Sequence, residues 1–349
     1  MKDYNDLLKT DARSIFIAEA GINHDGDVQK AIQMVDAAVA AGADYCKFQS
    51  FVAGKLVTPN ALTSTYIDNG SHAGESFRDL LNRLELSQED QKHLKDYCDR
   101  KGIKFLSTPF DAGSFDFLVD LGIDVVKVAS GNLTNLPILR HMASAQLPMF
   151  VSTGMATLGD IEEALEAILK EGNDRILLFH CISWYPAEIE TTNLRFMETL
   201  KSAFGYPVGY SDHTLGINMS IAARALGAVA LEKHFTLDSN QFGPDHKASI
   251  EPDEMRSLVT GLREVEAGLG SSVRIFGEKE IGQRKVHRTS IVTQTAVQAG
   301  DVFNGENLCI KRPGIGIAPK YWDDIIGKKA STTLEPETIL KWSDIDRQS

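Results

Sequence analysis

Residues 206–235, YPVGYSDHTLGINMSIAARALGAVALEKHF, have the pattern of one strand–helix–strand unit. Two short apolar runs flank a central segment whose apolar residues recur with the period of a helix. Six further apolar runs of this kind lie upstream, at 15–19, 44–49, 103–108, 124–130, 148–153 and 175–180. Helix-like segments separate them, among them 28–42 and 158–172. The alternation predicts a parallel sheet, and eight units in about 270 residues match a closed (β/α)8 TIM barrel, with an open doubly wound sheet as the alternative.

A short internal repeat supports the barrel. Three segments share a layout in which a glycine ends a helix and a charged residue appears late in the strand that follows: GADYCK (42–47), GIDVVK (122–127) and GAVALE (227–232). The glycine suits a left-handed helix cap. Lys47, Lys127 and Glu232 would lie deep in buried strands, where these residue types are almost never unpaired. Folding alone does not explain these charges.

Polar side chains gather at the carboxyl ends of the predicted strands, which is the face where barrel enzymes place their chemistry. They are Glu19, Lys47, Gln49, Thr108, Lys127, Ser130, Ser152, Thr153, His180, Ser211, His213, Glu232 and His234. An internal ion-pair network is the alternative explanation for any one of them. Taken together, the lysines and hydroxyl groups suit a phosphate and a carboxylate on a small molecule.

Two of these side chains, His213 and His234, follow neighbouring strands. Either histidine alone is more often structural than a ligand, but the pair could hold one divalent metal. With oxygen supplying the remaining ligands, Mn2+ is the first candidate, and Mg2+ and Co2+ are the alternatives. Glu19 and Asp245 are candidate general acid–base groups. The pattern predicts an enzyme that joins a phosphorylated carboxylate to a carbonyl compound.

Composition narrows the class of protein. The chain has 349 residues, 43% of them hydrophobic, and a net charge of −12, which argues against nucleic acid and anionic membranes as partners. Its four cysteines form no CxxC pair, so we expect reduced thiols in a cytoplasmic protein. The first residues are too polar for a signal peptide, and no apolar run reaches the roughly 18 residues of a membrane span.

The chain resembles the sialic acid synthase family, also called N-acetylneuraminate or nonulosonate synthases. The matching motifs are IAEAGINHDGD (17–27), AAGADYCKFQSF (40–51), FLSTPFD (105–111), KVASG (127–131), STGMATLGDIEEA (152–164), HCISWYPA (180–187), GYSDHTLG (209–216), LEKHFTLD (231–238), GPDHKASIEPDE (243–254) and KRPGIGI (311–317). The resemblance implies that phosphoenolpyruvate condenses with the open-chain aldehyde of an N-acetylmannosamine-type sugar. The products would be a nine-carbon 3-deoxy-2-keto acid, N-acetylneuraminate, and phosphate.

The resemblance also implies roles for single residues. His213 and His234 match the metal ligands, and Glu19 matches a carboxylate that handles protons on the attacking water or the sugar. The positions that match phosphoenolpyruvate ligands are Lys47, Thr108, Lys127, Ser130, Ser152 and Ser211. Those that match sugar contacts are Gln49, Tyr185 and Asp245.

Two departures from the family pattern concern the sugar. Asn132 stands where relatives commonly have glutamate, and Ser183-Trp184 replaces a more usual Asn or Thr followed by Ile or Glu. Both positions are therefore expected near the sugar. The alternative substrate is a 2,4-diacetamido-trideoxy hexose, which would make the chain an N,N'-diacetyllegionaminate synthase or a related enzyme.

The last part of the chain has a different composition. Residues 1–267 are predicted to form the barrel, and the glycine- and charge-rich residues 268–288 a linker. Residues 289–349 resemble the antifreeze-like (SAF) domain of this family. The resemblance implies a domain-swapped homodimer in which Arg312 contacts the sugar bound by the partner.

Two other classes of protein were considered. A different metal-dependent barrel, such as a hydrolase or a simple aldolase, would usually present three protein ligands for a water-activating zinc. A non-catalytic sugar-binding protein would not need the full set of Lys47, Lys127, His213 and His234.

Overall fold

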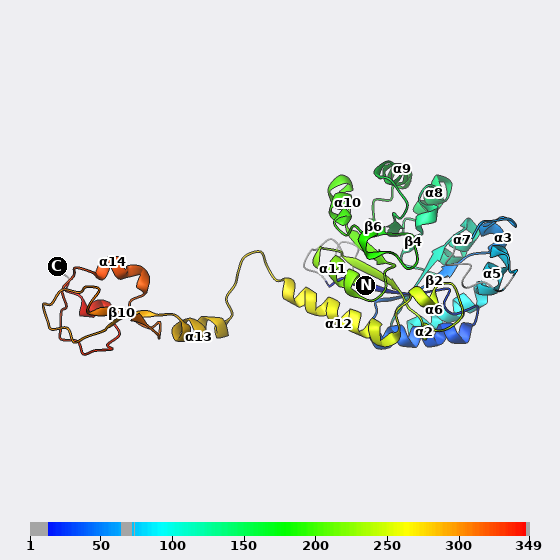
Figure 1. Cartoon of the computed structure of the whole chain (residues 1–349). Coiled ribbons are helices and arrows are strands. Elements are labelled where there is room, and N and C mark those ends of the chain that lie inside the picture. Colours follow the sequence, from blue (N-terminus) through cyan, green and yellow to red (C-terminus); the bar gives the residue numbers. More distant parts are fainter. Residues whose placement is uncertain (1–12, 64–71, 73, 347–349) are drawn as a thin grey trace. The chain divides into compact units, whose positions relative to one another are not determined.

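A computed structural model describes residues 13–63, 72 and 74–346. Eight parallel strands form one sheet in the order β3-β2-β1-β8-β7-β6-β5-β4. Figure 1 shows strands of this sheet with helices around them. They are β1 (Ile15–Gly21), β2 (Tyr45–Ser50), β3 (Lys104–Pro109), β4 (Val126–Val128), β5 (Met149–Ser152), β6 (Ile176–Cys181), β7 (Val208–Asp212) and β8 (Ala230–His234). Because β4 also lies beside β3, the sheet curls into a nearly closed barrel. Each apolar run expected as a strand overlaps one of these strands, which confirms the TIM-barrel prediction over the open sheet.

A helix follows each strand on the outside of the barrel, and the last one, α12, comes after β8. These helices are α2 (Val28–Ala41), α6 (Gln88–Lys101), α7 (Ala112–Asp120), α8 (Leu136–Ser144), α9 (Leu158–Leu169), α10 (Phe196–Phe204), α11 (Asn218–Ala225) and α12 (Pro252–Leu269). Two more helices, α3 (Ala53–Leu56) and α5 (Phe77–Leu84), lie between β2 and α6. Local signals set the helix ends. Thr157 and Asp160 form a capping box at the start of α9, and Gly42 ends α2 in the left-handed conformation.

Side chains inside the barrel change character along each strand. Because alternate residues of a strand share a face, Ile15, Ile17 and Glu19 all point inward. The apolar members of this inner set pack together toward the amino ends of the strands: Ile15, Ile17, Tyr45, Leu106, Val125, Phe150, Leu177, Phe179 and Ala230. The next inward positions are polar or charged. The apolar plug therefore lies beneath a polar chamber.

A glycine in β7 makes room for this plug. A Cβ on Gly209 would lie 2.9 Å from the ring of Phe179 and 2.7 Å from the carbonyl oxygen of Ala230. Any larger residue there would push Phe179 out of the inner layer. The outward faces of the strands pack against the helices in a larger apolar core that includes Phe16, Phe48 and Val151.

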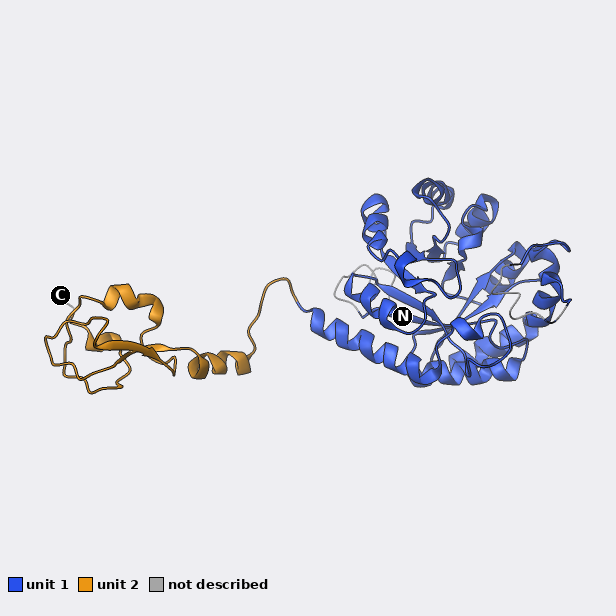
Figure 2. Ribbon diagram, in the orientation of Figure 1, with its two compact units in different colours: residues 1–270 blue, residues 271–349 orange. Residues whose placement is uncertain are grey.

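The chain divides into two compact units, residues 1–270 and 271–349 (Figure 2). Most of the stretch expected as a linker, 268–288, belongs to the second unit, where it contains α13 (Glu278–His287). That unit also has an antiparallel pair, β9 (Ser290–Thr293) and β10 (Leu308–Lys311), and the short helix α14 (Trp322–Ile325). Its own apolar core includes Ile291, Phe303 and Leu340.

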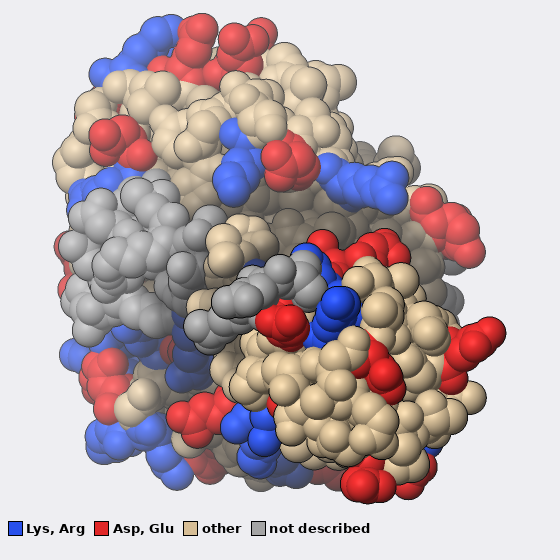
Figure 3. Space-filling model, turned by 90° about the vertical axis from the view of Figure 1, so that its left-hand side faces the viewer, with Lys and Arg blue, Asp and Glu red and all other residues tan. Residues whose placement is uncertain are grey.

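Three short 3-10 helices follow strands of the barrel: η1 (Ser130–Asn132), η2 (Ile189–Thr191) and η3 (His246–Ala248). The second unit contains two more, η4 (Pro319–Tyr321) and η5 (Trp342–Asp344). No helix in the described ranges is both long and apolar enough to cross a membrane. On the face drawn in Figure 3, basic and acidic side chains are interspersed.

Candidate active site

A cavity of about 460 Å³ opens at the carboxyl ends of the barrel strands. Its lining contains most of the side chains expected at the site, although Thr153 and His180, two of the polar residues at the strand ends, are not part of it. Those present are Glu19, Lys47, Gln49, Thr108, Lys127, Ser130, Ser152, Ser183, Tyr185, Ser211, His213, His234 and Asp245. Asn132 is not part of this lining, and Arg312 belongs to the second unit. Residues spread over more than 200 positions of sequence thus meet in one chamber.

Four buried charges form the floor of the cavity. Nζ of Lys47 lies 2.9 Å from a carboxylate oxygen of Glu19 and 3.5 Å from one of Glu232. Nζ of Lys127 lies 3.7 Å from the other oxygen of Glu232. Two hydroxyl groups complete the floor, since Lys47 donates to Thr108 at 3.1 Å and Lys127 donates to Ser152 at 2.5 Å. Charges removed from water in this way are tolerable because each has an opposite partner.

The surroundings shift the protonation of the two carboxylates in opposite directions. Burial raises the pKa of Glu19 to about 7, although Lys47 partly offsets the effect. Burial acts on Glu232 as well, but Lys127 and Lys47 outweigh it and hold the pKa of Glu232 below its usual value. At neutral pH Glu232 is therefore ionised, whereas Glu19 is near its midpoint and can give or accept a proton.

Glu232 is the functional candidate that the sequence reasoning left without a role. It was recognised as a strand-end charge, yet the structure puts it between the two lysines, where Ser211 also donates to it at 3.1 Å. The repeat GAVALE, which aligns Glu232 with Lys47 and Lys127, was the signal that could have assigned it to the site.

The two histidines lie side by side at the rim, with ring centroids 5.4 Å apart. Nδ1 of His213 donates to the carbonyl oxygen of Ile182 at 2.6 Å. Burial lowers the pKa of His213 to about 4, so the ring is neutral, and Nε2 carries the lone pair, 3.3 Å from the hydroxyl oxygen of Ser211. Burial and the neighbouring His213 also hold the pKa of His234 well below its usual value.

The second imidazole has an unsatisfied nitrogen. Nδ1 of His234 is buried, lies 3.5 Å from a carboxylate oxygen of Asp245, and has no hydrogen-bond partner among the described residues. Two neutral imidazoles with available lone pairs fit a divalent cation, and a backbone carbonyl that orients a ligating ring is a common supporting contact. Within the described part of the chain, no group of three His, Cys, Asp or Glu side chains forms a metal-binding cluster.

The side chains expected to meet the sugar surround the histidines. The ring of Tyr185 lies 4.1 Å from that of His213, and Gln49 donates to Glu19 at 3.4 Å. Burial raises the pKa of Asp245 to about 6. Ser183 packs closely, because a Cβ on Gly154 would lie 2.2 Å from its hydroxyl oxygen.

Asn132 does not reach the cavity lining. It is buried in η1, and its side-chain amide donates to the carbonyl oxygen of Pro109 at 3.5 Å. Of the two sequence departures expected near the sugar, Ser183 and Trp184 therefore line the cavity and Asn132 lies behind it. Arg312 is exposed and directly follows β10 in the second unit.

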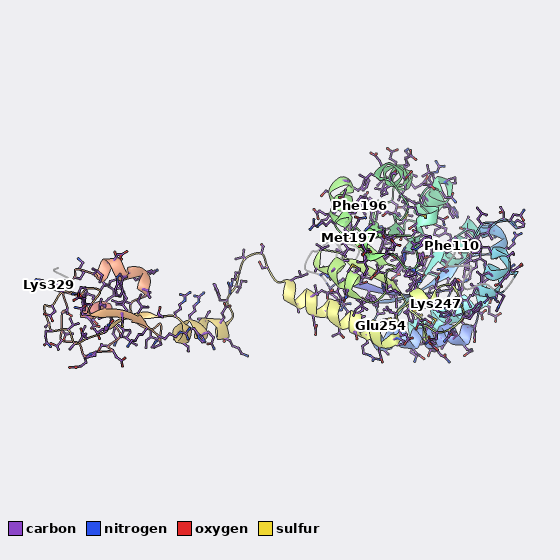
Figure 4. The ribbon with its side chains drawn as sticks, viewed as in Figure 1. Phe110, Phe196, Met197, Lys247, Glu254 and Lys329 are labelled. Atoms are coloured by element: carbon purple, nitrogen blue, oxygen red, sulfur yellow. The ribbon has the colours of Figure 1, made fainter. Side chains whose placement is uncertain are left out.

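One wall of the cavity is apolar, which the sequence reasoning did not anticipate. The loop after β1, helices α3 and α5, and the residue after β3 supply it: Ile22, Leu56, Phe77, Leu80, Leu81, Leu84 and Phe110, the last labelled in Figure 4. Leu80 and Leu84 are almost fully buried. The cavity thus has a charged floor and an apolar wall, a combination typical of sites for small molecules.

The fold and the site together define a (β/α)8 barrel with a cluster of buried charges at the carboxyl ends of its strands. Residues 34–274 match the NeuB family, and residues 288–346 match the SAF domain. The chain belongs to the NeuB family, which confirms the family, the SAF domain and the phosphoenolpyruvate-dependent condensing enzyme expected from the motifs.

Named relatives cover nearly the whole chain. It is 42% identical to an N,N'-diacetyllegionaminic acid synthase of Legionella pneumophila, over 95% of this chain and 94% of that one. It is 40% identical to the enzyme of the same name from Campylobacter jejuni, over 94% and 99%. The solved structure of an N-acetylneuraminic acid synthetase from Leptospira borgpetersenii is 31% identical and has a TM-score of 0.69, over 78% of this chain and 90% of that one.

Proposed function

We propose that this chain condenses phosphoenolpyruvate with the open-chain form of a 2,4-diacetamido-trideoxy hexose. The products are a nine-carbon 3-deoxy-2-keto acid and inorganic phosphate. The observation that carries the reaction is the pair of buried lysines, Lys47 and Lys127, facing a histidine pair in one chamber. N-acetylmannosamine was the first expectation for the sugar, but the names of the more similar relatives favour the diacetamido substrate.

The charged floor is suited to phosphoenolpyruvate. Lys47 and Lys127 can each exchange a carboxylate partner for an oxygen of the incoming anion, because both already face into the cavity. The hydroxyl groups of Thr108 and Ser152 are in contact with these lysines and can donate to the same oxygens. Such charge-assisted hydrogen bonds hold the phosphate and the carboxylate so that C3 of the enol points toward the histidine rim.

We propose that His213 and His234 hold a divalent cation, with Mn2+ preferred and Mg2+ or Co2+ as alternatives. Their neutral rings and the unpaired Nδ1 of His234 support this assignment. When bound, the cation supplies Lewis-acid polarisation of the sugar aldehyde.

The carboxylates handle the protons of the reaction. C3 of phosphoenolpyruvate attacks the aldehyde carbon, the aldehyde oxygen takes up a proton, water adds at C2, and phosphate leaves with cleavage of its C–O bond. With a pKa of about 7, Glu19 is suited to take a proton from the attacking water or to give one to the sugar oxygen. Asp245 and Gln49 both line the cavity and are placed to hold the sugar hydroxyl groups.

Phosphate release from phosphoenolpyruvate tests this function. We expect release only when a suitable sugar is present, and faster release with 2,4-diacetamido-trideoxy hexoses than with N-acetylmannosamine or pseudaminic-type precursors. Release without a sugar would instead indicate a hydrolase. Binding of sugar without any release would indicate a non-catalytic protein.

The apolar wall supports the trideoxy sugar. That sugar carries the methyl groups of C6 and of two acetamido groups, whereas N-acetylmannosamine presents hydroxyl groups at C4 and C6. Burying methyl groups against Leu56, Phe77 and Leu81 is favourable, and a hydroxyl group there would lose its hydrogen bonds to water.

A polar residue in the wall should change the choice of sugar. In Leu56→Gln the ratio of kcat/KM for the trideoxy sugar over N-acetylmannosamine should fall by roughly tenfold, the range for a methyl-sized contact. Leu62→Gln is the matched control, because Leu62 is 94% exposed and is not part of the cavity lining. Steady-state kinetics with both sugars give the ratio, and an equal loss for both would remove the wall from substrate selection.

We also propose that the enzyme works as a swapped homodimer in which Arg312 reaches the partner's sugar. Its planar guanidinium can donate to carbonyl and hydroxyl oxygens in a fixed geometry. The four free thiols fit the expected cytoplasmic location, since oxidising compartments favour disulfides.

Mixed dimers test the swapped arrangement. When Arg312→Ala and His213→Ala chains are co-expressed, one of the two sites in a heterodimer combines an intact barrel with an intact Arg312. The activity of purified heterodimers should therefore exceed that of either parent variant. Activity equal to the mean of the two parents would place each site within one chain.

A further inference from the structure

Two turns at the rim of the cavity are joined to each other. One is NHDG (23–26), between β1 and α2, and the other is GPDH (243–246), between β8 and η3. Nε2 of His246 lies 3.2 Å from the carboxylate of Asp25. Because a carboxylate only accepts, Nε2 carries the hydrogen of this bond. Lys30 pairs with the same carboxylate and also donates to Gln241, so a cation on α2 links the first turn to the segment just before the second.

The joint is buried and closely packed. His246 has no exposed surface, and its Nδ1 lies 2.7 Å from the hydroxyl group of Thr236. Gly243 lies against the pair, since a Cβ there would be 2.6 Å from the His246 ring and 3.1 Å from Asp25. The neighbouring residue in η3, Lys247, is exposed and is labelled in Figure 4. In η3, His246 therefore makes the contact with Asp25, whereas the side chain of Lys247 faces solvent.

A second chain of hydrogen bonds runs parallel to the first. The side-chain amide of Asn23 donates to Ser249 at 2.9 Å, and Ser249 donates to the backbone carbonyl of Asp245 at 2.6 Å. Asn23 also donates to the carbonyl oxygen of Phe235 at 2.8 Å. The backbone of Phe235 and, through Ser249, the backbone of Asp245 are thus tied to the turn after β1.

The side chain of Asp245 has little support of its own. It faces His234 at 3.5 Å, and no other ion pair to it is found in the described residues. Its direction into the cavity is therefore set by the backbone of the GPDH turn. We propose that the contact of Asp25 with His246, here called the Asp25–His246 clamp, positions Asp245 for the sugar. Asp25 and His246 are then positioning residues, and this inference rests on the sugar-binding role of Asp245 in the proposed function.

The backbone at Asp25 allows a clean test. Its φ is 55°, a left-handed conformation that glycine and asparagine tolerate. Asp25→Gly removes the carboxylate without adding backbone strain, and Asp25→Asn keeps a side-chain oxygen that can accept from His246. Gln146→Gly is the matched control, because Gln146 has the same φ of 55° and precedes β5 at the opposite end of the barrel.

The expected result is a selective loss. Asp25→Gly should lower kcat/KM for the sugar by roughly 10- to 100-fold, the range for a misplaced active-site group, and leave the Kd of phosphoenolpyruvate within about twofold. Asp25→Asn should recover part of the loss, and Gln146→Gly should match the wild type. In a protein that already carries Asp245→Asn, adding Asp25→Gly should lower kcat/KM by less than about twofold, because Asp25 acts through Asp245. Two outcomes would overturn the positioning role. One is a loss of kcat/KM in the double variant equal to the product of the losses in the two single variants. The other is an Asp245→Asn protein that is as active as the wild type.

A second measurement does not depend on turnover. The amides of Ala248 and Ser249 donate to carbonyl oxygens within the turn, so their hydrogen exchange reports its stability. We expect exchange there to be about tenfold faster in Asp25→Gly and unchanged in Gln146→Gly. Unchanged exchange in Asp25→Gly would show that no clamp exists. If the wild type turns over no sugar, the proposed function fails, and the exchange result still decides the clamp.

Discussion

Turnover should fall on the order of 100-fold or more in His213→Ala and in His234→Ala, as expected when a Lewis acid is lost from a carbonyl addition. Chelation of divalent cations from the wild type should abolish turnover, and Mn2+, Mg2+ or Co2+ should restore it. The reason lies in the two buried, neutral rings, which offer lone pairs into the same chamber. Phosphate release and metal content, measured on the same preparations, give the result.

A surface histidine supplies the control. His141 on α8 is partly exposed and pairs with Asp116, away from the cavity lining. His141→Ala should keep both its bound metal and its activity. Full activity of metal-free wild type would refute the proposed cation and leave the histidine pair with a purely structural role.

Binding of phosphoenolpyruvate should weaken by about 1.5–3 kcal/mol in Lys47→Met or Lys127→Met, which is the range for hydrogen bonds to charged groups. Methionine keeps the length of the stem and removes the charge. The loss of Lys127 also leaves Glu232 with one cation instead of two, so the remaining carboxylate repels the incoming anion. Calorimetry of phosphoenolpyruvate binding measures the change. Lys104→Met is the control, because Lys104 begins β3 at the end of the strand away from the cavity, and this variant should bind phosphoenolpyruvate like the wild type.

Glu232 makes it possible to separate binding from folding. Lys127→Met should lower the free energy of unfolding by on the order of 3 kcal/mol, because it breaks a buried ion pair. Adding Glu232→Gln should restore much of that stability without restoring phosphoenolpyruvate affinity. If the double variant regains affinity as well, then Lys127 serves the fold and does not contact the ligand.

The sequence predicted the barrel well because its signals are local and repeated. Eight apolar runs with helices between them leave few arrangements for a parallel sheet, and strand ends such as Lys47 and His213 must then meet at one face. The site residues on strands were accordingly brought together. The proposal of a diacetamido sugar, which is the alternative in the sequence analysis, rests on the names of two relatives.

Other features depend on contacts that no local pattern encodes. Asn132 was expected near the sugar because it interrupts a motif, but η1 turns its side chain toward Pro109. The apolar wall comes from α5, whose leucines look like ordinary helix core in the sequence. The contact between Asp25 and His246 joins residues 221 positions apart, and only the closed barrel brings them together.

The two-layer interior of the barrel has a consequence for heat tolerance and for evolution. The apolar plug around Phe150 and Phe179 contributes stability, whereas the chamber above it keeps four charges out of water and contributes little or opposes folding. Mutations in the polar chamber and its apolar wall can therefore change the substrate preference during evolution, while the apolar plug keeps the chain folded. Conversely, selection for a higher melting temperature acts first against the buried lysines and glutamates of the chamber. We therefore expect an unusually stable descendant of this chain to have lost its catalytic activity.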